Sequence, residues 1–183
     1  MADVEALQEI AGVVVVTPTM HGDERGVFLE TYRKEWLPEG APEMIQGNRA
    51  DRTAGCLVGM HYHRFQADYW YVPQGTALMA LHDLRVGSPT DGASYTVELG
   101  PDHGHKGVYI PPGVAHGFWS VTDMTITYLV DGYYNPDDEL GVAWDDPAMG
   151  ITWPGSDPVL SARDQANPLR ADLEDALRPR WGG

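Results

Sequence analysis

The sequence predicts an all-β protein, folded as a barrel or a sandwich of short strands. Segments rich in β-branched and aromatic residues recur along the chain, and this composition favours strands. Clusters of Gly, Pro, Asp and Asn separate these segments, as expected for turns between neighbouring strands. Helix signals are confined to the two ends of the chain. Many short strands at such spacing are typical of sandwiches and barrels.

The strands are predicted in chain order from these apolar segments and the turn residues between them. They cover residues 13–17, 27–32, 57–63, 69–72, 77–84, 94–99, 107–110, 117–121 and 125–130. Before them, residues 4–10 predict a short turn. After them, residues 162–177 predict a C-terminal helix that is interrupted at Pro168.

Length and composition predict one domain over residues 1–183, with a core at about 13–154 and a helical tail at about 155–183. No apolar run approaches the roughly 18 residues that span a membrane. The start lacks the basic region of a secretory signal, so a cytoplasmic location is expected. The single Cys56 excludes an internal disulfide and is interpreted as a small core residue.

The formal net charge is −15, with only 12 lysines and arginines against 27 aspartates and glutamates. A surface of this sign repels nucleic acid and anionic membranes, so neither is expected as a partner. An anionic small molecule would need a local basic pocket built from few cations.

Residues 55–75 contain two histidines two positions apart, His61 and His63, followed by Asp68. On a strand, this spacing points both imidazoles to one face. The spacing resembles the first cupin motif, and residues 111–116 resemble the second, which offers His116. Three imidazoles and one carboxylate suit a divalent transition metal such as Fe, Mn, Ni or Zn. A simple polar contact of Asp68 with His63 or Arg64 is the alternative.

Eight segments in order resemble the dTDP-4-dehydrorhamnose 3,5-epimerase family, over about residues 13–169. They are residues 22–30, 46–48, 59–62, 83–85 with 88–90, 110–118, 133–136, 144–147 with 150–154, and 160–164. The resemblance implies a cupin jelly-roll barrel, a homodimer, and an active site inside the barrel that needs no cofactor.

The family reaction removes a proton next to the C4 ketone of a nucleotide-linked 4-keto-6-deoxy sugar and returns one on the other face. The resemblance implies that His61 is the base, that Asp164 orients it, and that Tyr128 is the acid. It places Arg25 on the substrate phosphates, often across the dimer. It further implies substrate binding by Gln46, Asn48, His116 and Glu30.

Four positions depart from the family pattern. A family arginine before the Gly-Leu-His segment is Val58 here, and a family aspartate is Gly47. A family lysine near the substrate ketone is Asp68, and a carboxylate there would repel an enolate. A family glutamine is His63, so these last two changes complete the metal set of His61, His63, Asp68 and His116. A metal would then replace the lysine as a Lewis acid.

Three functions follow from these observations. The leading prediction is a diverged epimerase or isomerase of a keto sugar. The alternatives are a metal-dependent cupin oxygenase or lyase, and a non-catalytic sugar-binding cupin. Taken without the resemblance, Asp164 is equally a helix cap and Tyr128 a core residue. Two further groups are predicted at the surface or in solvated turns: His21, His82, His103 and His105; and Asp137, Asp138 and Glu139.

Overall fold

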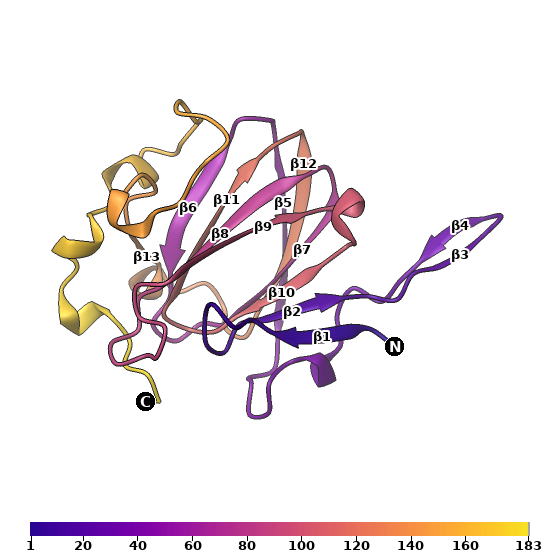
Figure 1. Ribbon diagram of the computed structural model, residues 1–183, viewed down its shortest axis with the longest axis horizontal. Helices are drawn as coiled ribbons and strands as arrows, with labels where there is room; N and C mark the ends of the chain where they lie inside the picture. Colours follow the sequence, from indigo (N-terminus) through magenta and orange to yellow (C-terminus); the bar gives the residue numbers. More distant parts are fainter. Residues whose placement is uncertain (183) are drawn as a thin grey trace.

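Two antiparallel sheets pack face to face in the computed structural model, which describes residues 1–182 (Figure 1). The first sheet has six strands in the order β1-β2-β10-β7-β12-β5. Their bounds are β1 Asp3–Ala6, β2 Val14–Thr17, β10 Gly107–Ile110, β7 Asp68–Gln74, β12 Met124–Val130 and β5 Gln46–Arg52. This double sheet confirms the predicted all-β, cupin-like fold.

The second sheet has five strands in the order β13-β6-β11-β8-β9. Their bounds are β13 Leu140–Gly141, β6 Leu57–Tyr62, β11 Val114–Ser120, β8 Ala77–Asp83 and β9 Ser94–Leu99. Neighbours in space are mostly distant in sequence, because the chain crosses repeatedly between the sheets. The predicted spans 94–99 and 107–110 coincide with β9 and β10.

The main core fills the space between the two sheets. Inward-facing residues of both sheets form it, because alternate residues of a strand point to the same face. They include Trp70, Val72, Val108 and Ile126 from the first sheet, and Met79, Leu81, Val114 and Phe118 from the second. Trp70 packs edge-on against Phe118, with ring centroids 5.6 Å apart. These core side chains fill part of the space between the sheets, and a pocket remains in another part of it.

A small hairpin extends away from the barrel (Figure 1). It consists of β3 His21–Asp23 and β4 Gly26–Phe28, and all six of these residues are exposed. Only the start of the predicted strand at 27–32 is therefore correct. The side chains of Val27 and Phe28 remain uncovered, at 63% and 67% exposure.

The predicted C-terminal helix is wrong. The tail forms three separate 3-10 turns, η5 Asp164–Ala166, η6 Arg170–Asp172 and η7 Asp175–Leu177. Pro168 disfavours helical backbone before it, and its carbonyl instead accepts a hydrogen bond from the Ala143 amide at 2.7 Å. The tail follows the outer face of the second sheet. The other 3-10 turns are η1 Lys34–Trp36, η2 Pro101–His103, η3 Pro136–Asp138 and η4 Pro147–Met149.

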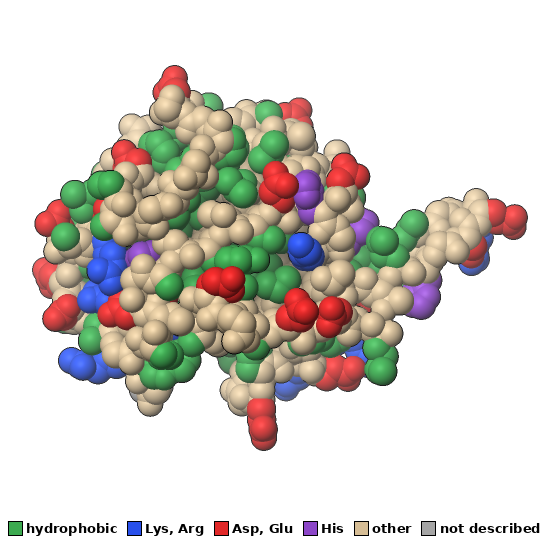
Figure 2. All heavy atoms as spheres, viewed as in Figure 1, with side chains coloured by type: hydrophobic (Ala, Val, Ile, Leu, Met, Phe, Trp, Pro, Cys, Tyr) green, Lys and Arg blue, Asp and Glu red, His purple; other side chains and the backbone are tan. Residues whose placement is uncertain are grey.

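The predicted turn at residues 4–10 is also incorrect in its first part, because Asp3–Ala6 form β1 and pair with β2. No helical turn within residues 1–182 has the length and apolar character that crossing a bilayer requires. Carboxylate side chains are spread over the face drawn in Figure 2, as the net charge of −15 leads one to expect.

Candidate active site

A pocket opens between the two sheets and is lined from both of them. β5, β7 and β12 supply one wall, and β6 and β11 supply the other. Tyr128 lies on the first wall, and His61 and His116 lie on the second. The loop after β12 contributes Glu139 at the rim. The pocket therefore collects most of the residues that the sequence predicted for the site.

His61 and Asp164 form a tight pair. The His61 Nε2 atom lies 2.6 Å from Asp164 Oδ1, and the carboxylate is 4% exposed. Burial alone would raise the pKa of Asp164, but the hydrogen bond from His61 and the remaining donors outweigh it and lower that pKa. Because an ionised carboxylate only accepts, Nε2 carries the hydrogen and Nδ1 is the nitrogen that can take a proton.

Two glycines set the position of this histidine. Gly59 has φ +116°, and a Cβ there would stand 2.8 Å from both Gly117 Cα and the His116 carbonyl oxygen. A Cβ at Gly117 would likewise lie only 2.7 Å from the Val58 carbonyl oxygen. The absence of both side chains lets β6 and β11 approach closely. His61 and His116 consequently face one another in the strand register.

Tyr128 stands on β12, where it pairs with Asn48 of β5 and Trp70 of β7. Burial raises the pKa of its hydroxyl, and the charge of Asp68 raises it further. The hydroxyl therefore keeps its proton at neutral pH. A protonated tyrosine on one sheet and a histidine–aspartate pair on the other have the arrangement of an acid and a base across a pocket.

A second cluster lies beside the dyad. His63, Asp68 and His116 each offer one ligand atom, and these atoms lie within 4.8 Å of one another. His116 and Asp68 are buried, at 4% and 3% exposure. Burial lowers the pKa of His116 to about 4 despite the opposing charge of Asp68, so this imidazole is neutral. The fourth residue of the sequence-predicted metal set, His61, instead directs its Nε2 atom to Asp164.

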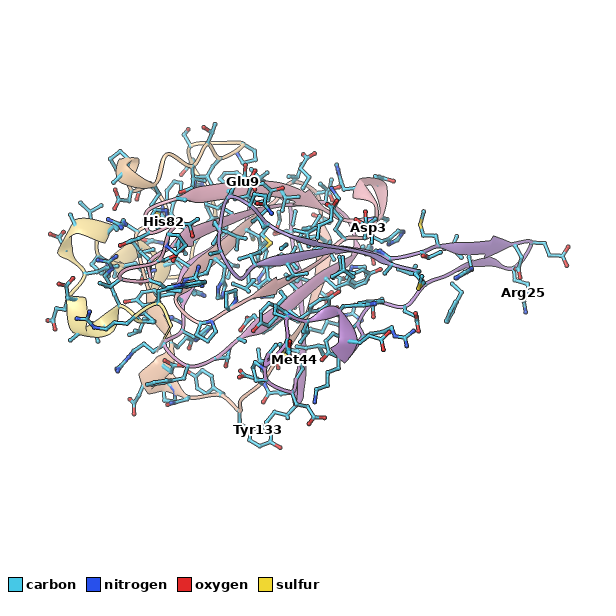
Figure 3. All side chains as sticks on the ribbon, turned by 60° about the horizontal axis from the view of Figure 1, so that its bottom comes forward. Asp3, Glu9, Arg25, Met44, His82 and Tyr133 are labelled. Atoms are coloured by element: carbon cyan, nitrogen blue, oxygen red, sulfur yellow. The ribbon has the colours of Figure 1, made fainter. Side chains whose placement is uncertain are left out.

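The predicted substrate-binding residues divide into two groups. Gln46 and Asn48 line the pocket with His116, and the Gln46 amide donates to Asn48 Oδ1 at 2.8 Å. Arg25 and Glu30 do not reach the pocket of their own chain. Arg25 lies at the end of the hairpin, paired with Asp23, and Figure 3 shows it far from the barrel. Glu30 accepts from Arg33 at 3.3 Å.

Three charged residues in or beside the pocket were not predicted for the site. Arg52, at the end of β5, is the only lysine or arginine among the described residues that line the pocket. Asp138, expected in a solvated loop, is 5% exposed and accepts the backbone amides of the loop after His63, at 2.7–3.3 Å. Glu139, expected in the same loop, lines the pocket and pairs with Arg163. No motif marks these positions, because long-range contacts give them their roles.

Comparisons with known proteins agree with this geometry. The family model described as dTDP-4-dehydrorhamnose 3,5-epimerase matches residues 7–172. The chain is 38% identical to a dTDP-4-dehydrorhamnose 3-epimerase of Streptomyces niveus over 91% of this chain and 84% of the relative. It is 34% identical to a dTDP-4-dehydrorhamnose 3,5-epimerase of Mycobacterium tuberculosis over 94% of this chain and 91% of the relative.

Solved structures give the same result. A dTDP-6-deoxy-D-glucose-3,5-epimerase of Legionella pneumophila, in complex with dTDP-4-keto-L-rhamnose, superposes with a TM-score of 0.92 at 30% identity and covers 100% of both chains. A 4-keto-6-deoxy sugar epimerase from the novobiocin gene cluster of Streptomyces spheroides gives 0.90 at 35% identity, covering 99% of this chain and 94% of that one.

Proposed function

This chain belongs to the dTDP-4-dehydrorhamnose 3,5-epimerase family and is an epimerase, and we propose that it inverts a carbon next to the ketone of a dTDP-linked 4-keto-6-deoxy sugar. One observation carries the proposal. A histidine held by a buried carboxylate lies on one sheet, and a protonated tyrosine lies on the other, with a pocket between them.

Inversion needs a proton to leave one face of the sugar and another to arrive on the opposite face. In this proposal, Nδ1 of His61 takes the proton, and the electron pair of the broken C–H bond forms a C=C bond. The carbonyl π electrons move to the oxygen, which gives an enolate. Tyr128 then donates its proton to the same carbon from the other wall. Asp164 stabilises the imidazolium that forms on His61, through the 2.6 Å hydrogen bond.

The same pocket offers a cation for the diphosphate of the substrate. Val58 stands where relatives are expected to carry an arginine, and both Val58 and Arg52 line the pocket. Their side chains come from opposite walls of this pocket, Val58 from β6 and Arg52 from the end of β5. We assign the diphosphate contact to Arg52, because an always-charged guanidinium binds phosphate oxygens in bidentate fashion.

We further propose a homodimer in which the β3–β4 hairpin reaches the partner. The hairpin leaves its own barrel with Arg25 at the far end and with two uncovered apolar side chains, Val27 and Phe28. Burial of those side chains on a second copy would stabilise the dimer. Mixing Arg25→Ala with His61→Asn protein tests this arrangement, because subunit exchange restores one complete pocket per heterodimer. A cytoplasmic location stays a prediction of the sequence.

The product of the reaction tests the proposed function. The protein is incubated with a dTDP-linked 4-keto-6-deoxy sugar, and ¹H NMR follows the ring coupling constants. We expect new signals whose couplings show an inverted centre next to the ketone, and none with His61→Asn. Binding of dTDP without any change in the sugar signals would contradict the proposal and indicate a sugar-binding protein.

A further inference from the structure

We infer that His63, Asp68 and His116 bind one divalent first-row transition-metal ion, in a site separate from the His61–Asp164 pair. Two imidazoles and one carboxylate that leave the remaining coordination positions open to a pocket suit such an ion. The sequence alone predicted four ligands, including His61. The geometry reduces the set to three and leaves His61 available as the base.

Both imidazoles are oriented by hydrogen bonds from Nδ1 to backbone carbonyls, and this is the first observation that supports the metal site. His63 Nδ1 lies 2.8 Å from the Asp138 carbonyl oxygen, and His116 Nδ1 lies 3.0 Å from the Val114 carbonyl oxygen. Because a carbonyl only accepts, each Nδ1 carries the hydrogen. In the neutral imidazole, this tautomer leaves the lone pair on Nε2. A backbone carbonyl that fixes the tautomer in this way is the usual outer support of a metal-binding histidine.

Asp68 is oriented by two donors in the same manner. The Gln66 side-chain amide donates to Oδ1 at 2.8 Å, and the Trp70 indole donates to Oδ2 at 3.1 Å. Asp68 Oδ2 lies 3.8 Å from His116 Nε2, which is beyond hydrogen-bond distance. These two donors hold the Asp68 carboxylate beside the two imidazoles. It makes no hydrogen bond to His116.

The cluster consequently brings three acceptor atoms together without a donor among them. These atoms lie within 4.8 Å of one another, and ligands on one ion at about 2.1 Å lie roughly 3–4 Å apart. Small side-chain rotations close this difference. A cation at the centre would bind the lone pairs of both imidazoles and the negative charge of Asp68 together. No hydrogen-bond donor within the cluster does this.

The loop that joins the ligands is also fixed. The Asp138 carboxylate accepts the amides of Arg64, Phe65 and Gln66, so the segment between His63 and Asp68 is tied to the loop after β12. The carbonyl of the same Asp138 orients His63. One buried residue therefore sets both the loop and the first ligand, which is the support that a preformed site requires.

The role of the ion rests on the proposed function. Epimerases of this family act without a cofactor, and in this chain Asp68 stands where the family pattern has a lysine near the ketone. A metal on Asp68 would reverse the local charge and polarise the ketone oxygen as a Lewis acid, which stabilises the enolate. His61, Asp164 and Tyr128 keep the proton transfers.

Metal binding without substrate tests the site. Protein purified without a histidine tag and stripped with a chelator is titrated with Co²⁺ and Zn²⁺, followed by visible absorption and elemental analysis. We expect one equivalent per chain in the parent, in His61→Asn and in the exposed-site control His21→Ala. His63→Ala, Asp68→Asn and His116→Ala should each weaken binding by more than about 100-fold. Circular dichroism and thermal melting confirm that each variant is folded.

Two results would overturn the site: no bound Co²⁺ or Zn²⁺ in the folded parent, or binding that survives Asp68→Asn and His63→Ala. Loss of binding in folded His61→Asn would overturn the separation of the two sites. The outcome is distinct from that of the proposed function. A chain that epimerises after complete metal removal contradicts the role of the ion alone, whereas a chain that binds metal and never epimerises contradicts the proposed function alone.

Discussion

At His61, the hydrogen bond from Nε2 to the Asp164 carboxylate leaves Nδ1 as the ring nitrogen that can accept a proton. Without the family resemblance, the sequence is equally consistent with Asp164 as a helix cap and Tyr128 as a core residue. The resemblance pairs Asp164 with His61 and makes Tyr128 the acid. The structure places Asp164 against His61 and brings Tyr128 to the pocket wall. The 103 positions that separate His61 from Asp164 explain why no local pattern shows their contact.

Arg52 provides a residue-scale prediction about substrate binding. Removing a charge-assisted hydrogen bond costs about 1.5–3 kcal/mol, which is roughly a 10–150-fold change in affinity. We expect Arg52→Ala to raise KM for the dTDP-linked sugar by this factor and to change kcat little, because the contact is remote from the reacting carbon. Steady-state kinetics measure both constants.

The matched control is Arg49→Ala. Arg49 lies on the same strand, but its side chain is 67% exposed and pairs with Asp51 outside the pocket. We expect its KM to match that of the parent. Equal values of KM for Arg52→Ala and the parent would remove Arg52 from the diphosphate site.

At the scale of elements, β5 shows why part of the site escaped prediction. Gln46–Arg52 alternates in burial, yet polar side chains occupy both faces of the strand. Alternate residues, Gln46, Asn48, Ala50 and Arg52, line the pocket. A strand is recognised from alternating hydrophobicity, and a strand that faces a polar pocket lacks it. Only the resemblance of residues 46–48 to a family motif marked this segment.

A motif of the sequence turns out to be structural. Asp83 is fully buried and accepts hydrogen bonds from Arg85, Ser88 and Thr90 at 2.6–2.9 Å. Burial alone would raise the pKa of Asp83, but these donors outweigh it and lower that pKa. The network anchors the loop after β8, and Arg85 also donates to the Ala11 carbonyl at 2.7 Å.

Removing Arg85 should therefore destabilise the protein strongly. Arg85→Ala leaves the buried Asp83 carboxylate without its cation, and we expect a loss of about 3–5 kcal/mol in the free energy of unfolding. Urea unfolding at neutral pH measures it. The control is Arg33→Ala, which removes exposed pairs with Glu30 and Glu35 and should cost less than about 1 kcal/mol. A loss of similar size in both variants would contradict the anchoring role.

For the whole molecule, the predictable part of the fold is the set of strands that face the core. Their apolar alternation and turn residues identified nine segments, and the double sheet contains eight of them. The exception is 27–32: its first two residues belong to the exposed hairpin, and residues 29–32 follow the hairpin without forming a strand. The C-terminal tail was mispredicted because its conformation depends on the sheet face it covers, including Met60, Tyr62 and Leu84, and on the interruption at Pro168.

His82 was predicted at the surface, and this was wrong. The side chain is fully buried under the tail, its Nδ1 lies 2.7 Å from Ser94 Oγ, and its Nε2 has no hydrogen-bond partner among residues 1–182. Burial lowers its pKa from 6.5 to about 4, aided by Arg170 and opposed by Asp83, Asp146 and Asp91. Between pH 4 and 6.5, His82 is therefore protonated in the unfolded chain and neutral in the folded protein.

Stability should therefore fall as the pH falls from 6.5 to about 4, because unfolding takes up a proton at His82 throughout this range. We expect His82 to account for up to about 3 kcal/mol of this loss. Urea unfolding across this range should show a shallower dependence for His82→Leu than for the parent. The exposed-site control His21→Leu should follow the parent. Identical slopes for His82→Leu and the parent would contradict a neutral buried His82.

Deuterium uptake from solvent tests most directly the claim that His61, oriented by Asp164, removes a proton next to a ketone. A dTDP-linked 4-keto-6-deoxy sugar is incubated with the protein in D₂O, and mass spectrometry of the recovered sugar counts the deuterium. We expect uptake with the parent, none above background with His61→Asn, and uptake slowed by about 10²–10⁴ with Asp164→Asn. Uptake at the parental rate in His61→Asn, or no uptake by folded parent that binds dTDP, would contradict it.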